Sequence, residues 1–317
     1  MEQTYKIGIV GLGSIGTRHL LNIVKVLASR NANYEIDLIR SGKGEATDAA
    51  LERLTSRTVY SYAEAGDDYD VVFITNPTHR HYETVKQFVP KTKHMFIEKP
   101  VFDTTSVLIE DLKLKDGSVY YVACPLRYSN VIRYLKEKIN PDDVYSVRAI
   151  CSSYLPGWRA NSDYRQSYSA HRDKGGGVSI DLIHEWDYLR YLFGDPERVC
   201  NIKGTFSNLE LDSDDLSLYI AEYKDKTIEL HLDYFGRKTI REVQIFTRED
   251  TITADIANNE IRFLKQEKTI SFAAQGNDFF YKEMETFFDM LEEKAANNND
   301  ISAALETLRI AKGEDKA

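Results

Sequence analysis

A glycine-rich turn near the start of the chain constrains its fold more than any other feature. An apolar run, Lys6–Val10, leads directly into Gly11, Gly13 and Gly16, which have the spacing G-x-G-x-x-G. Between a strand and a helix, the first of these glycines permits a tight turn and the second lets the backbone approach a pyrophosphate. The third lets the helix pack close to the strand. The spacing therefore predicts a dinucleotide-binding turn, provided that a helix follows it.

The residues after the turn do indicate a helix. Apolar side chains recur at helical intervals, at Leu20, Ile23, Val24 and Leu27. The first N–H groups of this helix, at Ser14 and Ile15, and the positive end of its dipole are then available to phosphates. Because a strand precedes the glycine turn and a helix follows it, we favour a cofactor site over an ordinary tight turn.

Composition favours a globular protein of two domains. The chain has 317 residues, which is long for one hydrophobic core. Its formal net charge of −9 argues against nucleic acid or an anionic membrane as a partner. Its three cysteines lack C-x-x-C spacing, so we expect reduced thiols in a cytoplasmic protein. No metal site is expected, since no His, Cys or Asp cluster has ligand spacing, and no apolar run is long enough to span a membrane.

The first third of the sequence alternates between strand and helix patterns. Continuous apolar strands in this order predict a doubly wound parallel sheet, a Rossmann domain, over residues 1–123. The expected strands are Tyr5–Val10, Tyr34–Arg40, Val71–Thr75, His94–Glu98 and Ser118–Cys124, and the expected helices are Thr17–Ser29, Asp48–Leu54, Tyr82–Val89 and Thr105–Lys113.

The pattern changes after about residue 143. Residues such as Thr227–Tyr234 alternate between apolar and polar, which is typical of a half-exposed antiparallel strand. We therefore expect residues 124–317 to form an α+β domain with an open, largely antiparallel sheet, whose last helix can pack back on the first domain. The other expected elements are the strands Val144–Ser153, Glu197–Ser207, Asp215–Tyr223 and Thr239–Thr247, and the helices Ser179–Phe193, Asp278–Lys294 and Ser302–Lys312.

The end of the second predicted strand favours NADP(H) over NAD(H). Sites that prefer NAD carry Asp or Glu there for the ribose 2′-OH, whereas this strand ends in Arg40-Ser41. A guanidinium and a hydroxyl can hold a 2′-phosphate through charge-assisted hydrogen bonds. Asp37 lies too early, inside the strand. The alternative for Arg40 is a solvated arginine in a loop.

Two further motifs carry a resemblance to a known family. Glu98-Lys99-Pro100 follows Thr75-Asn-Pro-Thr-His-Arg-His81, and the stretch Gly175–Gly194 contains Asp181-Leu-Ile-His184-Glu-Trp-Asp187. Together with the glycine turn, these motifs resemble the glucose-fructose oxidoreductase/inositol dehydrogenase (Gfo/Idh/MocA) family over nearly the whole chain. The resemblance implies a nicotinamide cofactor, a sugar or polyol substrate, and a homodimer or homotetramer built through the C-terminal sheet.

The resemblance also assigns the catalytic residues. The lysine of the family's E-K-P motif corresponds to Lys99, which contacts the nicotinamide ribose and the reacting hydroxyl, and the catalytic histidine corresponds to His184. The family's D-x-x-x-H spacing is one residue shorter here, so Asp181 and Asp187 are alternative partners of the imidazole on the predicted helix. Histidine suits proton transfer near neutral pH, and an ammonium stabilises a developing alkoxide. Taken alone, His184 could be a structural histidine and Lys99 a solvated lysine.

The remaining candidates lie in loops after the predicted strands. Candidate cofactor contacts are Thr75, Asn76, Pro77, His81 and Glu98, although His81 could equally belong to a turn with a helix cap at Thr78.

Arginine forks suit anions and tyrosines suit sugar faces, so loop residues of these types are candidate substrate ligands. They are Arg127, Arg159, Tyr164, Arg165 and His171, beside Lys99, Asp181 and His184. Ordinary surface loops have a similar composition. The stretches Trp158–Arg165 and Tyr168–His171 resemble a branch of the family found in bacterial surface-sugar biosynthesis, which implies a sugar nucleotide or an acylated amino sugar.

The leading hypothesis is an NAD(P)-dependent oxidoreductase that transfers a hydride between the nicotinamide and a hydroxyl or keto carbon of a sugar, polyol or sugar nucleotide. A second hypothesis is a transient-redox enzyme, such as an epimerase or lyase, which would show no net change of its tightly bound cofactor. A third is a non-catalytic NADP-sensing or scaffold protein. The presence of both Lys99 and His184 argues against the third.

Overall fold

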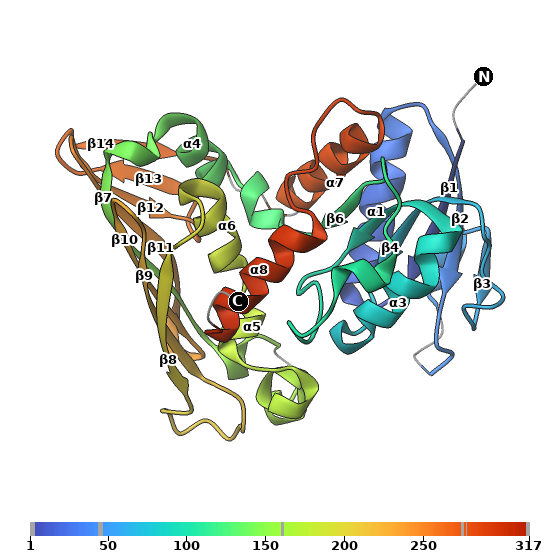
Figure 1. Cartoon of the computed structure of the whole chain (residues 1–317), viewed down its shortest axis with the longest axis horizontal. Helices are drawn as coiled ribbons and strands as arrows, with labels where there is room; N and C mark the ends of the chain where they lie inside the picture. Colours follow the sequence, from blue (N-terminus) through green and yellow to red (C-terminus); the bar gives the residue numbers. More distant parts are fainter. Residues whose placement is uncertain (1–3, 44–46, 160–161, 274–275, 277, 315–317) are drawn as a thin grey trace. The chain divides into compact units, whose positions relative to one another are not determined.

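The computed structural model describes residues 4–43, 47–159, 162–273, 276 and 278–314, and the chain divides into two compact units (Figure 1). The first unit comprises Met1–Ala123 and Phe280–Leu305, and the second comprises Cys124–Phe279 and Glu306–Ala317. The stretch 280–305 therefore belongs to the first unit, although it follows the second sheet in sequence.

The first unit contains a six-stranded sheet with the order β3-β2-β1-β4-β5-β6, and all of its strand pairs are parallel. Its strands are β1 Thr4–Val10, β2 Asn33–Ile39, β3 Arg57–Val59, β4 Tyr69–Ile74, β5 Thr92–Ile97 and β6 Tyr120–Val122. Its helices are α1 Ser14–Ser29, α2 Ala49–Glu52, α3 His81–Phe88 and α7 Asp278–Leu291. This is the strand order of a dinucleotide-binding Rossmann fold, so the predicted fold class is confirmed for this unit.

The core of this unit explains why its strands read as continuous apolar runs. Phe73 on β4 and Phe96 on β5 are fully buried and stack with ring centroids 5.2 Å apart. Phe287 on α7 meets Phe96 edge to face at the same distance. Strands covered on both faces cannot alternate with polar residues, since every side chain is removed from water.

The second unit contains an eight-stranded sheet with the order β14-β13-β12-β11-β7-β10-β9-β8. Only β10 and β7 are parallel among its described pairs, and the other neighbours are antiparallel, so the predicted largely antiparallel sheet is confirmed. The strands are β7 Val144–Tyr154, β8 Arg198–Gly204, β9 Leu216–Glu222, β10 Thr227–Asp233, β11 Phe235–Thr247, β12 Thr251–Asp255, β13 Glu260–Phe263 and β14 Lys268–Ser271.

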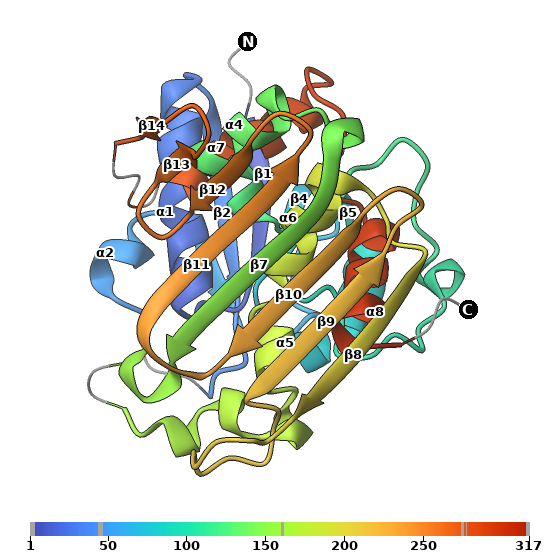
Figure 2. The ribbon, with the colours of Figure 1, turned by 90° about the vertical axis from the view of Figure 1, so that its left-hand side faces the viewer.

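The helices α5 (Val178–Asp181) and α6 (His184–Phe193) lie behind this sheet in Figure 2. Trp186 of α6 is fully buried and meets Tyr219 of β9 edge to face, with ring centroids 5.3 Å apart. The unit also contains α4 (Asn130–Lys138), and α8 (Ile301–Lys312) ends in it. The opposite face of the sheet, which faces the viewer in Figure 2, carries exposed side chains such as Ile202 and Ile220.

Some predicted elements were wrong. The predicted helix Ser179–Phe193 is two helices, separated at Leu182 and Ile183. On either side of this break, Asp181 is bonded to Tyr234 and Glu185 is paired with Arg241, and such tertiary contacts override helix propensity. The predicted helix Thr105–Lys113 is reduced to a 3-10 turn, Ile109–Leu112, which ends at Lys113 in the left-handed conformation. The sequence patterns did not predict α4, β3 or the strands β12 to β14.

No helix of the described residues is long and apolar enough to span a bilayer. Cys124, Cys151 and Cys200 are all free thiols, and Cys200 is exposed.

Candidate active site

Four of the predicted segments follow neighbouring parallel strands at one edge of the first sheet. Gly11 follows β1, Arg40 follows β2, Thr75 follows β4 and Glu98 follows β5. The carboxyl ends of parallel strands form one edge, and the order of this sheet reverses between β1 and β4. Ligands of open α/β sheets bind at such an edge. The topology therefore brings these four segments together.

The glycines of the turn have different geometric roles. Gly11 has φ +94°, and a Cβ at this position would lie 2.9 Å from the backbone of Asn76. A Cβ on Gly16 would lie 2.5 Å from the carbonyl oxygen of Gly11, so the close approach of α1 to the turn requires glycine. Thr75 Oγ1 donates a hydrogen bond to that same oxygen (2.7 Å). Thr75 thus shapes the turn.

Gly13 shows that the turn fits a dinucleotide. A Cβ built on Gly13 would have no atom of the described chain within 4 Å, in contrast to Gly11 and Gly16. Gly13 is also the N-cap of α1, and no side chain caps this helix end in the described structure. The backbone is therefore open at a positive helix terminus, where phosphate groups bind. Ser14 and Ile15 are the first two residues of that helix.

Arg40 and Ser41 extend from the end of β2, and Ser41 is exposed. Arg40 Nη1 donates a hydrogen bond to Thr47 Oγ1 (2.6 Å), which orients the guanidinium. Asp37, in contrast, accepts both bonds of the Arg57 fork, with distances of 3.0 and 2.8 Å. Asp37 therefore belongs to a structural ion pair inside the sheet.

A buried carboxylate supports the E-K-P segment. Glu98 accepts a hydrogen bond from His19 Nε2 of α1 (2.6 Å) and one from the Lys99 backbone N–H (3.1 Å). Burial alone would raise the pKa of Glu98, but the His19 bond and charge outweigh it and hold the pKa below its usual value. Glu98 thus links α1 to the backbone of Lys99, and its role as a cofactor contact stays a prediction. Lys99 itself is half-buried.

His81 and Asn76 are held by the fold. The His81 ring is buried, with Nε2 2.9 Å from the Asn76 carbonyl oxygen and Nδ1 3.0 Å from that of Pro100. Burial lowers the pKa of His81, despite these carbonyls. Asn76 Nδ2 donates to Thr84 Oγ1 (2.8 Å), while Pro77 is exposed. His81 therefore joins the loops after β4 and β5, and Thr78 provides no side-chain cap for the turn that it begins.

The second unit surrounds His184 with charged groups. His184 Nε2 lies 2.7 Å from Arg241 Nη2 and 3.2 Å from Glu185 Oε1. Arg241 Nε lies 2.9 Å from the same carboxylate oxygen, and the Tyr188 hydroxyl donates to Glu185 Oε2 (2.7 Å). No sequence pattern predicted Arg241, Glu185 or Tyr188 as site residues.

The carboxylates proposed as partners of His184 have other contacts. Asp181 accepts a hydrogen bond from the Tyr234 hydroxyl (2.5 Å). Asp187 accepts two bonds from Arg127, at 2.7 and 2.9 Å, and both side chains are buried. Arg127 therefore fixes α6 through an ion pair. This geometry favours a structural role for Arg127 over substrate binding, and it makes Asp187 the partner of Arg127.

The other candidate substrate ligands lie in the loop after β7, where three of them have contacts within the loop or with Glu210. The Arg165 side chain pairs with Asp163 (2.9 Å), and His171 Nε2 lies 2.8 Å from the Arg165 carbonyl oxygen. The Tyr164 hydroxyl accepts a bond from the Glu210 N–H (3.0 Å). Arg159 is exposed. Residues 160 and 161 of the Trp158–Arg165 stretch lie outside the described residues.

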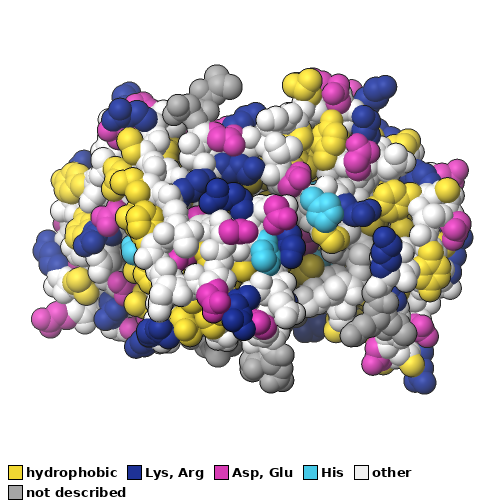
Figure 3. Space-filling view, turned by 90° about the horizontal axis from the view of Figure 1, so that it is seen from below, with side chains coloured by type: hydrophobic (Ala, Val, Ile, Leu, Met, Phe, Trp, Pro, Cys, Tyr) yellow, Lys and Arg dark blue, Asp and Glu magenta, His cyan; other side chains and the backbone are white. Residues whose placement is uncertain are grey.

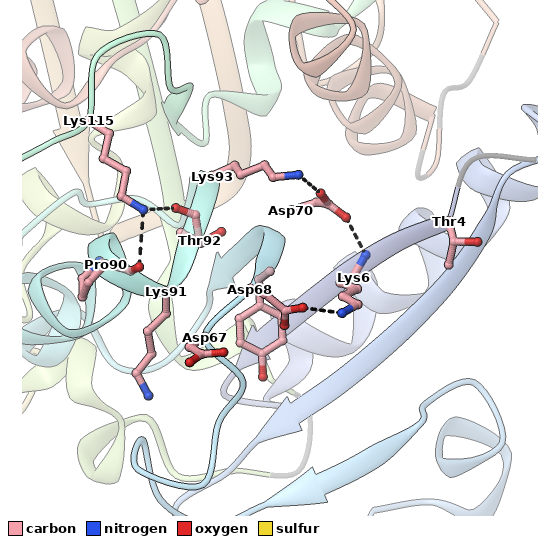
Figure 4. Close-up of a pocket in the computed structure, with 11 residues that line it drawn as sticks. Thr4, Lys6, Asp67, Asp68, Asp70, Pro90, Lys91, Thr92, Lys93 and Lys115 are labelled. Carbon is pink, nitrogen blue, oxygen red and sulfur yellow. Dashed lines mark hydrogen bonds and ion pairs between the residues drawn. The ribbon is translucent and has the colours of Figure 1, made fainter.

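A hollow on the first unit lies at the opposite edge of the parallel sheet (Figure 4). Two of its lysines form ion pairs, Lys93 with Asp70 at 2.7 Å and Lys6 with Asp68. Lys115 Nζ donates to the Thr92 carbonyl oxygen (2.9 Å). Because these residues surround the amino ends of the strands, the hollow is not part of the candidate site.

The sequence predicted neither a metal site nor a nucleic-acid-binding surface. Among the described residues, no group of three or more His, Cys, Asp and Glu side chains could hold a metal ion. On the face shown in Figure 3, acidic and basic side chains are mixed, whereas nucleic-acid-binding surfaces carry a patch of clustered basic side chains.

Comparisons with known proteins agree with this geometry. Residues 5–114 match the model of an oxidoreductase family with an NAD-binding Rossmann fold, and residues 136–313 match the C-terminal alpha/beta domain of the same family. An inositol 2-dehydrogenase/D-chiro-inositol 3-dehydrogenase of Lacticaseibacillus casei is 25% identical over 197 residues, which are 60% of this chain and 53% of that protein. An uncharacterized oxidoreductase of Bacillus subtilis (strain 168) is 28% identical over 192 residues, 59% of this chain and 53% of that protein. The matches span about half the length of these relatives.

Solved structures share the fold. Levoglucosan dehydrogenase in complex with NADH has a TM-score of 0.82 at 18% identity, over 98% of this chain and 96% of that chain. The WlbA dehydrogenase from Bordetella pertussis, in complex with NADH and UDP-GlcNAcA, has a TM-score of 0.76 at 17% identity, over 98% and 95% of the two chains. At these identities the likeness establishes the fold.

Proposed function

The chain belongs to the Gfo/Idh/MocA oxidoreductase family, and we propose that it transfers a hydride between a nicotinamide cofactor and a hydroxyl or keto carbon of a sugar, polyol or sugar nucleotide. The observation that carries this proposal is the carboxyl edge of the parallel sheet. There the open glycine turn and the supported Lys99 follow neighbouring strands of a Rossmann fold. The relatives named inositol dehydrogenase and the sugar-nucleotide complex of a similar structure support the substrate class.

The side chains have distinct proposed roles. A bound nicotinamide supplies the hydride acceptor or donor. The Gly13 backbone and the first turn of α1 hold the pyrophosphate. During oxidation of an alcohol, the Lys99 ammonium stabilises the negative charge that develops on the oxygen, and His184 takes the hydroxyl proton. In the reverse direction, His184 returns that proton to the carbonyl oxygen.

A substrate screen with matched variants tests this function. We expect net reduction or oxidation of the nicotinamide with at least one free sugar, polyol or sugar nucleotide. Lys99→Met should lower kcat by about 10²–10³-fold, and His184→Gln by about 10²–10⁴-fold. Both variants should keep the cofactor affinity, measured by fluorescence titration. Lys93→Met, at the other end of β5, is the control and should keep the wild-type kcat and cofactor affinity. Wild-type turnover in either site variant would contradict its role, and activity without net cofactor change would favour transient redox.

We further propose that the cofactor is NADP(H). Arg40 and Ser41 provide a cation and a hydroxyl where an NAD site carries a carboxylate, and the bond to Thr47 orients the guanidinium. A charge-assisted hydrogen bond contributes about 1.5–3 kcal/mol, so Arg40→Gln should weaken NADPH binding by roughly 10–100-fold and leave NADH binding nearly unchanged. The exposed Arg53→Gln on the neighbouring helix end serves as the control. Equal losses for both cofactors would contradict this preference.

Two copies of the chain are proposed to associate through the outer face of the eight-stranded sheet. Ile202 on β8 and Ile220 on β9 are 64% and 50% exposed, and the register places Leu218 and Cys200 on the same face. Exposed aliphatic side chains on a continuous sheet face indicate a buried interface. A cytoplasmic location is proposed as well, supported by three free thiols.

A further inference from the structure

Arg241, in the charged cluster around His184, is an unusual residue for the inner face of a sheet. Arg241 lies on β11 with Val243 and Ile245, which are fully buried on the inner face of the sheet. Its register partner on β7 is Cys151, which is also buried. An arginine on the core face of a strand requires partners for its charge and donors. It forms an ion pair with Glu185, donates to His184 and also bonds the Cys151 thiol.

The Arg241 guanidinium donates a hydrogen bond to His184 and lies at ion-pair distance from Glu185. Its Nη2 lies 2.7 Å from His184 Nε2, and its Nε lies 2.9 Å from Glu185 Oε1. The His184 and Glu185 atoms themselves are 3.2 Å apart. A guanidinium has only donors and stays protonated in proteins. Since Arg241 supplies the proton of the 2.7 Å contact, His184 Nε2 must present its lone pair.

We propose that Arg241 is a positioning residue, which holds the His184 ring in the neutral form with the proton on Nδ1 and the lone pair of Nε2 directed at the guanidinium. The inference deepens the proposed function and rests on it, because it concerns the proton carrier of that reaction. Any proton passed to Nε2 must displace the Arg241 N–H. Arg241 therefore lowers the basicity of His184.

The other groups around the ring agree with this assignment. Burial would raise the pKa of Glu185, but the Arg241 charge, together with His184 and the Tyr188 hydroxyl, outweighs burial and lowers the pKa to about 2, so this neighbour is a carboxylate. Burial raises the pKa of Cys151 to about 12 and that of Tyr188 well above its usual value, so both are neutral. Asp181, the acidic group on α5, is bonded to Tyr234. Arg241 is thus the fixed cation that contacts Nε2.

Removing Arg241 and removing the Glu185 charge should shift the pKa of the His184 ring in opposite directions. Without Arg241, Glu185 Oε1 would face Nε2 at 3.2 Å with no donor between them, and Nε2 would take up a proton. Without the Glu185 charge, Arg241 would face the imidazole alone and hold it neutral to lower pH.

Nitrogen-15 NMR of the histidine rings tests the proposal without substrate or cofactor. His184→Gln identifies the signals of the ring. In the wild type, we expect a protonated Nδ1 and an unprotonated Nε2 at neutral pH. Arg241→Met should move the proton to Nε2 and raise the ring pKa, whereas Glu185→Gln should keep the wild-type tautomer and lower the pKa. Arg148→Met, which removes an exposed pair with Glu229 on β10, is the control and should change neither.

A protonated Nε2 in the wild type, or an unchanged ring in Arg241→Met, would overturn the proposal. Should Arg241→Met fail to fold, the wild-type tautomer and the titration of His184 in Glu185→Gln still test the proposal. If the screen above reveals a substrate, the acid limb of kcat/KM should move to higher pH in Arg241→Met, a shift that a purely structural role would not give. A correct tautomer in a protein without sugar activity would refute the proposed function and leave the ring assignment standing.

Discussion

Gly13 and Gly16 are three residues apart, yet they differ in the space that is available for a side chain. The space around Gly13 is open to a Cβ, while the space at Gly16 is filled by the Gly11 carbonyl. Gly13→Ala should therefore keep the melting temperature of the free protein, because its φ of −80° is allowed for alanine. It should weaken cofactor binding by about tenfold or more, an effect of roughly 1.4 kcal/mol, since the methyl group occupies the phosphate position.

Gly16→Ala is the matched contrast to this variant. Its methyl group meets a backbone oxygen, so we expect a loss of about 1–3 kcal/mol of stability before any cofactor is added. Thermal unfolding with and without NADPH separates the two effects. A Gly13→Ala protein that binds NADPH as tightly as the wild type would show that the cofactor does not approach this backbone.

The sequence predicted these local features far better than the surroundings of His184. The glycine turn and the E-K-P segment are contiguous in sequence, and each follows a strand whose apolar pattern is unmistakable. Arg241 is 57 residues from His184, and only the register of β11 against β7 brings it to the inner face. One sequence signal could have identified it: an arginine two residues before Val243 in an alternating strand occupies an inward position.

Helix α6 illustrates how a tertiary contact overrules spacing. Asp187 is three residues from His184, which made it a candidate partner of the imidazole, but Arg127 from the turn before α4 binds it with two bonds. The Arg127 guanidinium also lies 4.9 Å from the ring of Tyr191. Helical neighbours can interact only when no stronger partner reaches them from another element.

Breaking this ion pair should destabilise the protein without changing substrate affinity. Arg127→Met leaves a buried carboxylate without its partner, which costs about 3–5 kcal/mol in the free energy of unfolding. Urea unfolding should show this loss, and the double variant Arg127→Met/Asp187→Leu should recover much of it. Arg148→Met, which breaks an exposed pair, should cost less than about 1 kcal/mol. A stable Arg127→Met protein with a raised KM would instead indicate that Arg127 binds the substrate.

The two sheets of the chain differ in how completely they are covered. Both faces of the parallel sheet are buried, so its strands are apolar throughout, whereas the eight-stranded sheet alternates and leaves one face with exposed isoleucines. Alternation predicted this open face correctly, because a period of two follows directly from strand geometry. A second copy is proposed to cover this face, and no pattern within one chain specifies the contacts of such an interface.

The proposed interface predicts the behaviour of the whole molecule in solution. Wild-type protein should elute with the mass of a dimer or tetramer in size-exclusion chromatography with light scattering. Ile220→Lys places a charge at the centre of β9, where burial of an unpaired ammonium is costly, so it should shift the mass toward a single chain. Leu108→Lys, a similar change at a 63% exposed leucine of the first unit, should leave the mass unchanged. A monomeric wild type, or an Ile220→Lys protein that keeps the wild-type mass, would refute association through this face.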